Sequence, residues 1–219
     1  MVRLRRRSLP DATIARLPQY IRCLSQLENA GLQTVHSVDL AAHVGVSGAV
    51  VRRDLSYVGS YGTRGVGYPV TQLREQVNQA LGLATEHRMV VVGVGHLGRA
   101  LAGYTGFNER GLRVVGLFDV DPGLIGSKAG SPSGEYLEIL TLAELPSFVA
   151  DNGVAIGVIA TPAEAAQSVA DLLVAAGVTS ILNLSAVHLS TPDSVVVRPV
   201  DLATEIQILA VHAAHGAGR

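Results

Sequence analysis

A glycine-rich segment in the middle of the chain carries the residues best suited to chemistry. Its sequence, Gly93-Val94-Gly95-His96-Leu97-Gly98, has the spacing GxGxxG and stands between an apolar run, residues 89–92, and a helical pattern that includes Arg99. In such a strand, turn and helix, the first glycine permits the turn, the second lets a pyrophosphate approach the backbone, and the third lets the helix pack on the strand. Amides of a helix starting at Leu97 would bind the phosphates, with the His96 side chain beside them. The segment predicts a dinucleotide site.

The next strand supplies an acidic residue at the matching position. A second apolar run, residues 113–118, ends at Asp119, 21 residues after Gly98. A carboxylate there accepts a hydrogen bond from the 2′-hydroxyl of the adenine ribose and repels a 2′-phosphate. The two motifs together favour NAD(H) over NADP(H).

The rest of the C-terminal half predicts a doubly wound parallel sheet. Further apolar runs occupy residues 154–159, 180–184 and 195–197. A helical pattern, residues 163–176, follows Thr161-Pro162. Ligands of such sheets lie at the carboxyl ends of the strands, so the loop at Thr161 and Pro162 and the loop 184–187, which contains Ser185, should border the cofactor.

The histidines do not form a convincing catalytic pair. Hydride transfer needs a proton donor near the nicotinamide, commonly His, Lys or Tyr. His188 follows the run 180–184, and His212 and His215 lie near the C-terminus, where structural or solvent-facing roles explain them more simply. Only one helix, residues 202–212, follows the predicted cofactor fold, which leaves no room for a separate substrate domain. The sequence therefore favours a protein that binds a dinucleotide without turning it over.

The N-terminal half predicts a small helical domain. A long helical pattern begins at Pro10-Asp11 and ends near residues 29–31. Ser37 is expected to cap a short helix, residues 38–44, and Ser47 a second one, residues 48–57, with a turn at Gly45 between them. Two helices joined by a short turn containing glycine have the spacing of a helix-turn-helix.

A glycine-rich stretch follows the second of these helices and predicts a hairpin with tight turns, such as the wing of a winged helix. Arg52 and Arg53 on the helix and Arg64 in the hairpin would then face nucleic acid, because arginine binds guanine edges and phosphates. The alternative is a solvated surface on which Arg52 or Arg53 pairs with Asp54 or Asp39. The predicted DNA-binding residues are Ser47, Arg52, Arg53, Tyr57, Arg64 and Gly65, and Tyr57, Tyr61 and Tyr68 are expected to wedge the wing against the helices.

Composition and charge agree with two halves that have different partners. The net charge of −1 combines 11 Lys and Arg against 6 Asp and Glu in residues 1–88 with 6 against 12 in residues 89–219. A basic half suggests a polyanionic partner. No apolar stretch approaches the ~20 residues of a membrane span, and the single Cys23, at core spacing on a helix, fits a reducing cytoplasm. The helix 202–212 is apolar on several sides, which indicates burial against its own domain or a second subunit.

The segments VRRDLSYVGSYGTRGVGY, VVVGVGHLGRAL, FDVDPGLIG, TPAEAAQSVADLLVAAGV and ILNLSAVHL occur in this order. Over residues 10–212 the chain resembles Rex, the bacterial redox-sensing transcriptional repressors. The resemblance implies a homodimer that binds NADH and NAD+, binds operator DNA when NADH is scarce, and releases it when the NADH/NAD+ ratio rises. It divides the chain into a winged-helix domain, residues 1–84, a Rossmann domain, residues 85–198, and a C-terminal helix, residues 199–219, swapped between subunits.

The resemblance also implies a polar switch made of Arg22, Tyr104 and the partner subunit's Asp201, and it adds Tyr104 and Asp201 to the cofactor site. Where this chain has Asn183-Leu184-Ser185-Ala186, the family often has an aromatic residue and a proline, so the resemblance implies cofactor binding but does not assign the contacts to the nicotinamide. Two other functions stay open: an NAD-dependent oxidoreductase with a helical oligomerisation domain, and a repressor that binds coenzyme A. Asp119, and the lack of a basic cluster for a 3′-phosphate, disfavour the latter.

Overall fold

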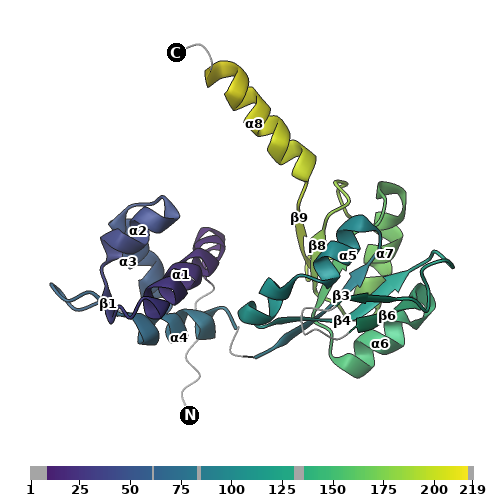
Figure 1. Cartoon of the computed structure of the whole chain (residues 1–219), viewed down its shortest axis with the longest axis horizontal. Helices are drawn as coiled ribbons and strands as arrows, with labels where there is room; N and C mark the ends of the chain where they lie inside the picture. The colour runs from purple at the N-terminus through teal and green to yellow at the C-terminus, as the bar shows by residue number, and fades with distance from the viewer. Residues whose placement is uncertain (1–8, 61, 83–84, 131–135, 217–219) are drawn as a thin grey trace. The chain divides into compact units, whose positions relative to one another are not determined.

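The computed structural model describes residues 9–60, 62–82, 85–130 and 136–216. The chain divides into two compact units, Met1–Thr85 and Glu86–Arg219 (Figure 1). The expectation for Tyr61 falls outside the described residues. No described helix is long and apolar enough to cross a membrane.

The first unit contains four helices and one very short strand pair. The helices are α1 (Asp11–Asn29), α2 (Ser37–Val44), α3 (Gly48–Tyr57) and α4 (Val70–Ala80), and the strands are β1 (Thr34–Val35) and β2 (Tyr68–Pro69), which pair antiparallel. Each helix turns an apolar side inward, and together they enclose one core that includes Leu17, Tyr20, Leu24, Leu40, Val51, Leu55, Leu73 and Val77. Cys23 also lies in this core, where burial raises the pKa of its thiol.

The predicted helix-turn-helix is confirmed, with one correction to a cap. Helix α2 ends at Val44, and the next residue, Gly45, has a left-handed φ of 71° that favours glycine. The Ser47 hydroxyl accepts a hydrogen bond from the Val50 N–H and caps α3 as expected. The prediction for Ser37 was wrong by one residue, because α2 already includes it and the backbone N–H of the preceding His36 donates to the carboxylate of Asp39.

The wing is smaller than the predicted hairpin. A single antiparallel bridge joins Thr63 to Gly67, and Tyr68 pairs with Val35 of β1 instead of with the other arm of the hairpin. Gly67 has a φ of 92°, and a Cβ there would lie 2.4 Å from the Val35 carbonyl oxygen, so the turn needs glycine at this point. Tyr68 is buried as a wedge, whereas Tyr57 is 37% exposed.

The second unit is a seven-stranded sheet with the order β5-β6-β4-β3-β7-β8-β9, parallel except for β5. Its strands are β3 (His87–Val92), β4 (Leu112–Asp119), β5 (Lys128–Gly130), β6 (Tyr136–Thr141), β7 (Ile156–Ile159), β8 (Ser180–Asn183) and β9 (Val196–Pro199). Its helices are α5 (His96–Ala102), η1 (Thr105–Arg110), η2 (Leu142–Glu144), α6 (Leu145–Asn152), α7 (Ala163–Ala175) and α8 (Leu202–Gly216). The strand order reverses between β3 and β7, as in a doubly wound Rossmann fold.

Two apolar clusters cover the two faces of this sheet. Residues of α6 and α7, such as Val149 and Leu173, pack on Phe118 and the other inward side chains of one face. On the opposite face Ala102 of α5 packs with Met89 and its neighbours. The central parallel strands β3, β4 and β7 are therefore buried on both sides, which explains their continuous apolar runs. The sequence had left β5, β6 and α6 unassigned.

Helix α8 does not pack against its own unit. It begins after Asp201, whose carboxylate accepts hydrogen bonds from the Ala203 and Thr204 N–H groups and from the Thr204 hydroxyl. All its side chains from Leu202 to His215 are exposed. Large apolar ones among them are Leu202, Ile206, Ile208, Leu209 and Val211. The sequence predicted burial of this helix either against its own domain or against a second subunit. Because these side chains are exposed, the helix is not buried against its own domain.

Candidate functional site

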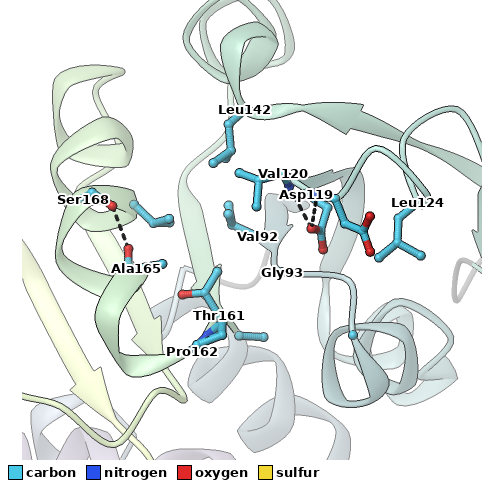
Figure 2. A pocket seen from close by; sticks show the side chains of 14 residues that line it. Val92, Gly93, Asp119, Val120, Leu124, Leu142, Thr161, Pro162, Ala165 and Ser168 are labelled. Carbon is cyan, nitrogen blue, oxygen red and sulfur yellow. Dashed lines mark hydrogen bonds between the residues drawn. The ribbon is translucent and has the colours of Figure 1, made fainter.

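A cavity of about 500 Å³ lies at the carboxyl ends of β3, β4 and β7, beside the point where the strand order reverses. Figure 2 shows side chains from the three strand ends and from α7 around it. Ligands of doubly wound sheets lie at this position. The lining residues are Val92, Gly93, Gly95, Asp119, Val120, Asp121, Leu124, Leu142, Ala160, Thr161, Pro162, Ala165, Ser168 and Val169.

The three glycines of the GxGxxG segment differ in what surrounds them. A Cβ at Gly93, where φ is 92°, would lie 2.7 Å from the Ala160 carbonyl, and a Cβ at Gly98 would lie 1.9 Å from the Gly93 oxygen. The fold itself thus requires these two glycines. A Cβ at Gly95 would meet no atom within 4 Å, although Gly95 lines the cavity. The open space beside Gly95 is what a pyrophosphate passing close to the backbone would need.

Two side chains of opposite charge hold the middle of this loop. The Val94 N–H donates to Asp119 Oδ2 at 2.6 Å, and Arg99 Nε donates to the Val94 carbonyl at 3.1 Å. Asp119 Oδ1 also accepts from the N–H groups of Val120 and Asp121. A carboxylate has about four acceptor positions, so Asp119 is fixed in place and keeps capacity for a ribose hydroxyl.

Thr161 supplies a polar atom that lacks a partner. Its Oγ1 is buried and has no hydrogen bond within the described part of the chain, although the residue lines the cavity. Buried hydroxyls are nearly always hydrogen-bonded, so a buried hydroxyl without a partner beside a cavity is suited to hydrogen-bond a ligand. The residues present therefore fit a dinucleotide.

The other predicted cofactor residues lie outside the cavity lining. His96 and Leu97 are exposed at the start of α5, which begins one residue before the predicted start at Leu97. The Ser185 hydroxyl donates to Asn183 Oδ1 at 2.6 Å. Tyr104 is 47% exposed and packs edge-on against Phe107, and the hydrogen bond from the Thr204 hydroxyl holds the pKa of Asp201 below its ordinary value. Val94, in the loop before α5, and Gly98, in α5, are buried.

Several lining residues were missed by the sequence analysis. Val120, Asp121 and Leu124 lie in the loop that follows Asp119 at the end of β4, so the rule that placed other loops at strand ends could have found them. The first turns of α7 contribute further lining, at Ala165 and Ser168. Leu142 could not be predicted as a lining residue, because it follows β6, a strand that the sequence analysis did not predict.

Among the described residues, neither Arg52 nor Arg53 forms the ion pair with Asp54 or Asp39 that was the alternative prediction. Arg52 donates to the Ser37 hydroxyl at 2.9 Å, while Arg53 has neither a side-chain hydrogen bond nor an ion pair among the described residues. Arg64 is exposed in the turn between Thr63 and Gly67. Asp54 instead pairs with Arg16 of α1, at 2.6 Å between Oδ2 and Nε. Gly65 and Arg22 are also exposed.

Comparison with known proteins matches both units. A family model described as "CoA binding domain" covers residues 84–187, and one described as "Putative DNA-binding protein N-terminus" covers residues 8–56. The redox-sensing transcriptional repressor Rex of Streptomyces coelicolor is 51% identical over 98% of this chain and 81% of its own length. The chain belongs to the Rex family. Rex of Carboxydothermus hydrogenoformans is 49% identical over 92% of this chain and 94% of its own.

Solved structures of a Rex-family repressor, RSP, agree over almost the whole chain. RSP in complex with NAD+ and operator DNA has a TM-score of 0.88, 31% identity, and covers 96% of this chain and 95% of its own. RSP in complex with NADH has a TM-score of 0.83, 30% identity, and covers 96% and 97%. The Rex fold, a DNA-binding N-terminal unit joined to a Rossmann unit, is therefore the fold of this chain.

Proposed function

We propose that this protein is a transcriptional repressor that senses the NADH/NAD+ ratio: it binds operator DNA when NADH is scarce and releases it when NADH binds. One observation carries the proposal. A Rossmann cavity with open space at Gly95 and a fixed acid at Asp119 occurs in the same Rex-family chain as a helix-turn-helix whose Arg53 has no side-chain partner among the described residues. In this proposal the cavity binds the cofactor, and α3 with its wing binds the operator DNA.

The active species is a homodimer in which α8 packs on a second copy of the chain. The apolar side chains of α8 are exposed in the single chain, and such a surface needs a partner. Helix-turn-helix dimers bind half-sites about 34–36 Å apart, so a change in the arrangement of two subunits decides whether both recognition helices reach the grooves. Because the operator is chromosomal DNA, we place the protein in the cytoplasm.

NADH must bind the released arrangement more tightly than NAD+ does, since a ligand shifts an equilibrium only by its differential affinity. The two cofactors differ by a hydride and the nicotinamide charge, so discrimination occurs at that ring. Asp201, held ionised by its hydrogen bond from Thr204, is suited to sense the charge. By the family resemblance, Arg22 and Tyr104 complete the switch.

The test uses a DNA duplex that the cofactor-free protein selects from a random-sequence pool. In a mobility-shift titration we expect NADH to release the duplex at lower concentration than NAD+, and NADPH or coenzyme A to have little effect. Saturating duplex should in turn raise the NADH dissociation constant about 5–150-fold, as a coupling of 1–3 kcal/mol requires. An NADH dissociation constant that the duplex leaves unchanged would refute the proposal.

Two alternatives are tested in parallel. The family description of residues 84–187 as a CoA binding domain favours coenzyme A, whereas Asp119 at the ribose position opposes its 3′-phosphate. Release by coenzyme A in the same titration would decide for it. We further propose that the chain is no enzyme, because its Rex relatives are named transcriptional repressors and the described residues that line the cavity include no histidine, lysine or tyrosine as a proton donor. Steady NADH oxidation with carbonyl substrates would contradict this.

Asp119→Ala is expected to weaken NADH binding about tenfold and to reduce the preference for NADH over NADPH, since one hydrogen bond to a charged group and one repulsion are lost. Asp121→Ala is the matched control, because Asp121 lines the same cavity and carries the same charge. Both affinities follow from titrating the fluorescence of the reduced cofactors. If the preference is the same in wild type and Asp119→Ala, Asp119 does not bind the ribose.

A further inference from the structure

Asp54 follows the two recognition-helix arginines in sequence but lies on the opposite side of α3, and it is only 1% exposed. Its carboxylate accepts four hydrogen bonds, all from α1. Oδ1 accepts from the Thr13 hydroxyl at 2.9 Å and from Arg16 Nη2 at 2.8 Å, and Oδ2 accepts from Arg16 Nε at 2.6 Å and from the Tyr20 hydroxyl at 2.8 Å. Every acceptor position of the carboxylate is thus occupied.

Within this cluster the Asp54 carboxyl is held in its ionised form. Burial alone would raise the pKa of Asp54, but the hydrogen bonds from Arg16, Tyr20 and Thr13 outweigh it and leave the pKa below its ordinary value. Burial and the hydrogen bond to Asp54 raise the pKa of the Tyr20 hydroxyl, which therefore keeps its proton and donates it. The cluster is complete, with no buried charge left unpaired.

Stability alone does not explain such a cluster, because well-packed apolar side chains of similar volume hold two helices together as firmly as a buried ion pair does. A bidentate ion pair instead fixes the relative orientation of the two helices, because Nε and Nη2 of Arg16 must align with the two carboxylate oxygens of Asp54. The burial of the neighbouring Val51 and Leu55, by contrast, sets no such direction, because the hydrophobic effect is non-directional.

Rotation of α3 matters for its exposed side. Successive residues of an α-helix point about 100° apart, so fixing Asp54 also fixes the direction of Arg53, the next residue back. Bidentate contact with a guanine edge depends on that direction, whereas contact with a phosphate depends mainly on charge. A loosened α3 would therefore lose base recognition before it loses general affinity for DNA.

We infer that Asp54 is a positioning residue for DNA recognition: with Arg16, Tyr20 and Thr13 it fixes the rotation of α3 on α1 and so aims Arg53 at the bases. This inference rests on the proposed DNA-binding function. Asp54 itself touches no DNA, and its effect passes through α3.

The test compares Asp54→Asn with the exposed control Glu75→Gln on α4, which removes the same charge. Full-length protein is titrated into the selected duplex and into a scrambled duplex of equal length, followed by fluorescence anisotropy, together with thermal unfolding and NADH titration. We expect Asp54→Asn to lose about tenfold in affinity for the selected duplex, the size of one lost base contact. Its affinities for the scrambled duplex and for NADH should stay within about twofold of wild type, as should all affinities of the control.

A second variant keeps the inference testable if Asp54→Asn does not fold. The quadruple variant Thr13→Val, Arg16→Met, Tyr20→Phe, Asp54→Leu replaces the ion pair and both hydroxyls that donate to it by apolar groups, so that no buried polar group loses its partner. It is expected to fold while losing the same specificity. A folded quadruple variant, or a folded Asp54→Asn, whose ratio of selected to scrambled affinity equals that of wild type would overturn the inference. If wild type itself selects no duplex, the proposed function fails and the inference fails with it. If wild type selects a duplex and the folded variants keep its ratio, only the inference fails and the proposed function stands.

Discussion

Arg53→Ala is expected to lower the affinity for the selected duplex about 10- to 100-fold while leaving the scrambled duplex bound nearly as well, because one base contact contributes about 1–3 kcal/mol. Arg53 is the arginine of α3 whose side chain is exposed and free of intramolecular partners within the described residues. Arg52 differs, since its guanidinium donates to the Ser37 hydroxyl of α2. We therefore expect Arg52→Ala to weaken both duplexes alike and to reduce the salt dependence by about one phosphate contact.

The measurement is anisotropy with both duplexes over a range of salt concentration, with NADH titration and thermal unfolding as controls. Both arginines are exposed, so neither substitution should change the free energy of unfolding by more than about 0.5 kcal/mol. Loss of NADH binding together with DNA binding would indicate misfolding. If Arg52→Ala changes the specificity and Arg53→Ala does not, the two arginines have the opposite roles.

The parts of the site that could be predicted are those set by local sequence. The GxGxxG segment and Asp119 have fixed roles because a turn, a close approach and a strand end each demand a particular residue. The structure agrees at Gly93 and Gly98, where a Cβ would collide with backbone. The helix-turn-helix was equally local, since Gly45 and Ser47 mark its turn and its second cap.

The parts that could not be predicted depend on contacts distant in sequence. Strand β6 pairs with β4 but carries Glu138 between its apolar residues, so it showed no continuous apolar run. The wing appeared to be an independent hairpin because its strand partner, β1, lies more than 30 residues earlier in the chain. Asp54 seemed to be a surface partner for its neighbouring arginines, whereas its partner Arg16 is 38 residues away.

The switch formed by Arg22, Tyr104 and Asp201 stays a prediction of a different kind. Each of these residues has an ordinary local explanation in the single chain: Asp201 caps α8, Tyr104 packs on Phe107, and Arg22 is exposed on α1. The resemblance assigns the switch to contacts between subunits, and no property of one chain can select those residues. The cavity and the arginines of α3, in contrast, are recognisable within one chain.

Gly95→Ala is expected to weaken binding of both NADH and NAD+ about 10- to 100-fold with little change in stability. A Cβ at Gly95 meets no protein atom within 4 Å, and the residue has a φ of −70°, so alanine fits the folded chain. The added methyl group instead occupies space at the cavity that the pyrophosphate needs, and inserting a methyl group into a filled site costs about 1–3 kcal/mol. Cofactor fluorescence and thermal unfolding measure the two effects.

Two neighbouring glycines supply the comparison. Gly103→Ala should change neither property, because its Cβ would lie at ordinary contact distance, 3.7 Å, from the Arg99 carbonyl oxygen and Gly103 does not line the cavity. Gly98→Ala should reduce both stability and cofactor affinity, since its Cβ would lie 1.9 Å from the Gly93 oxygen. Only Gly95 is expected to separate binding from folding. Wild-type NADH affinity in Gly95→Ala would mean that the pyrophosphate does not pass over this loop, and the cavity would then have to bind another ligand.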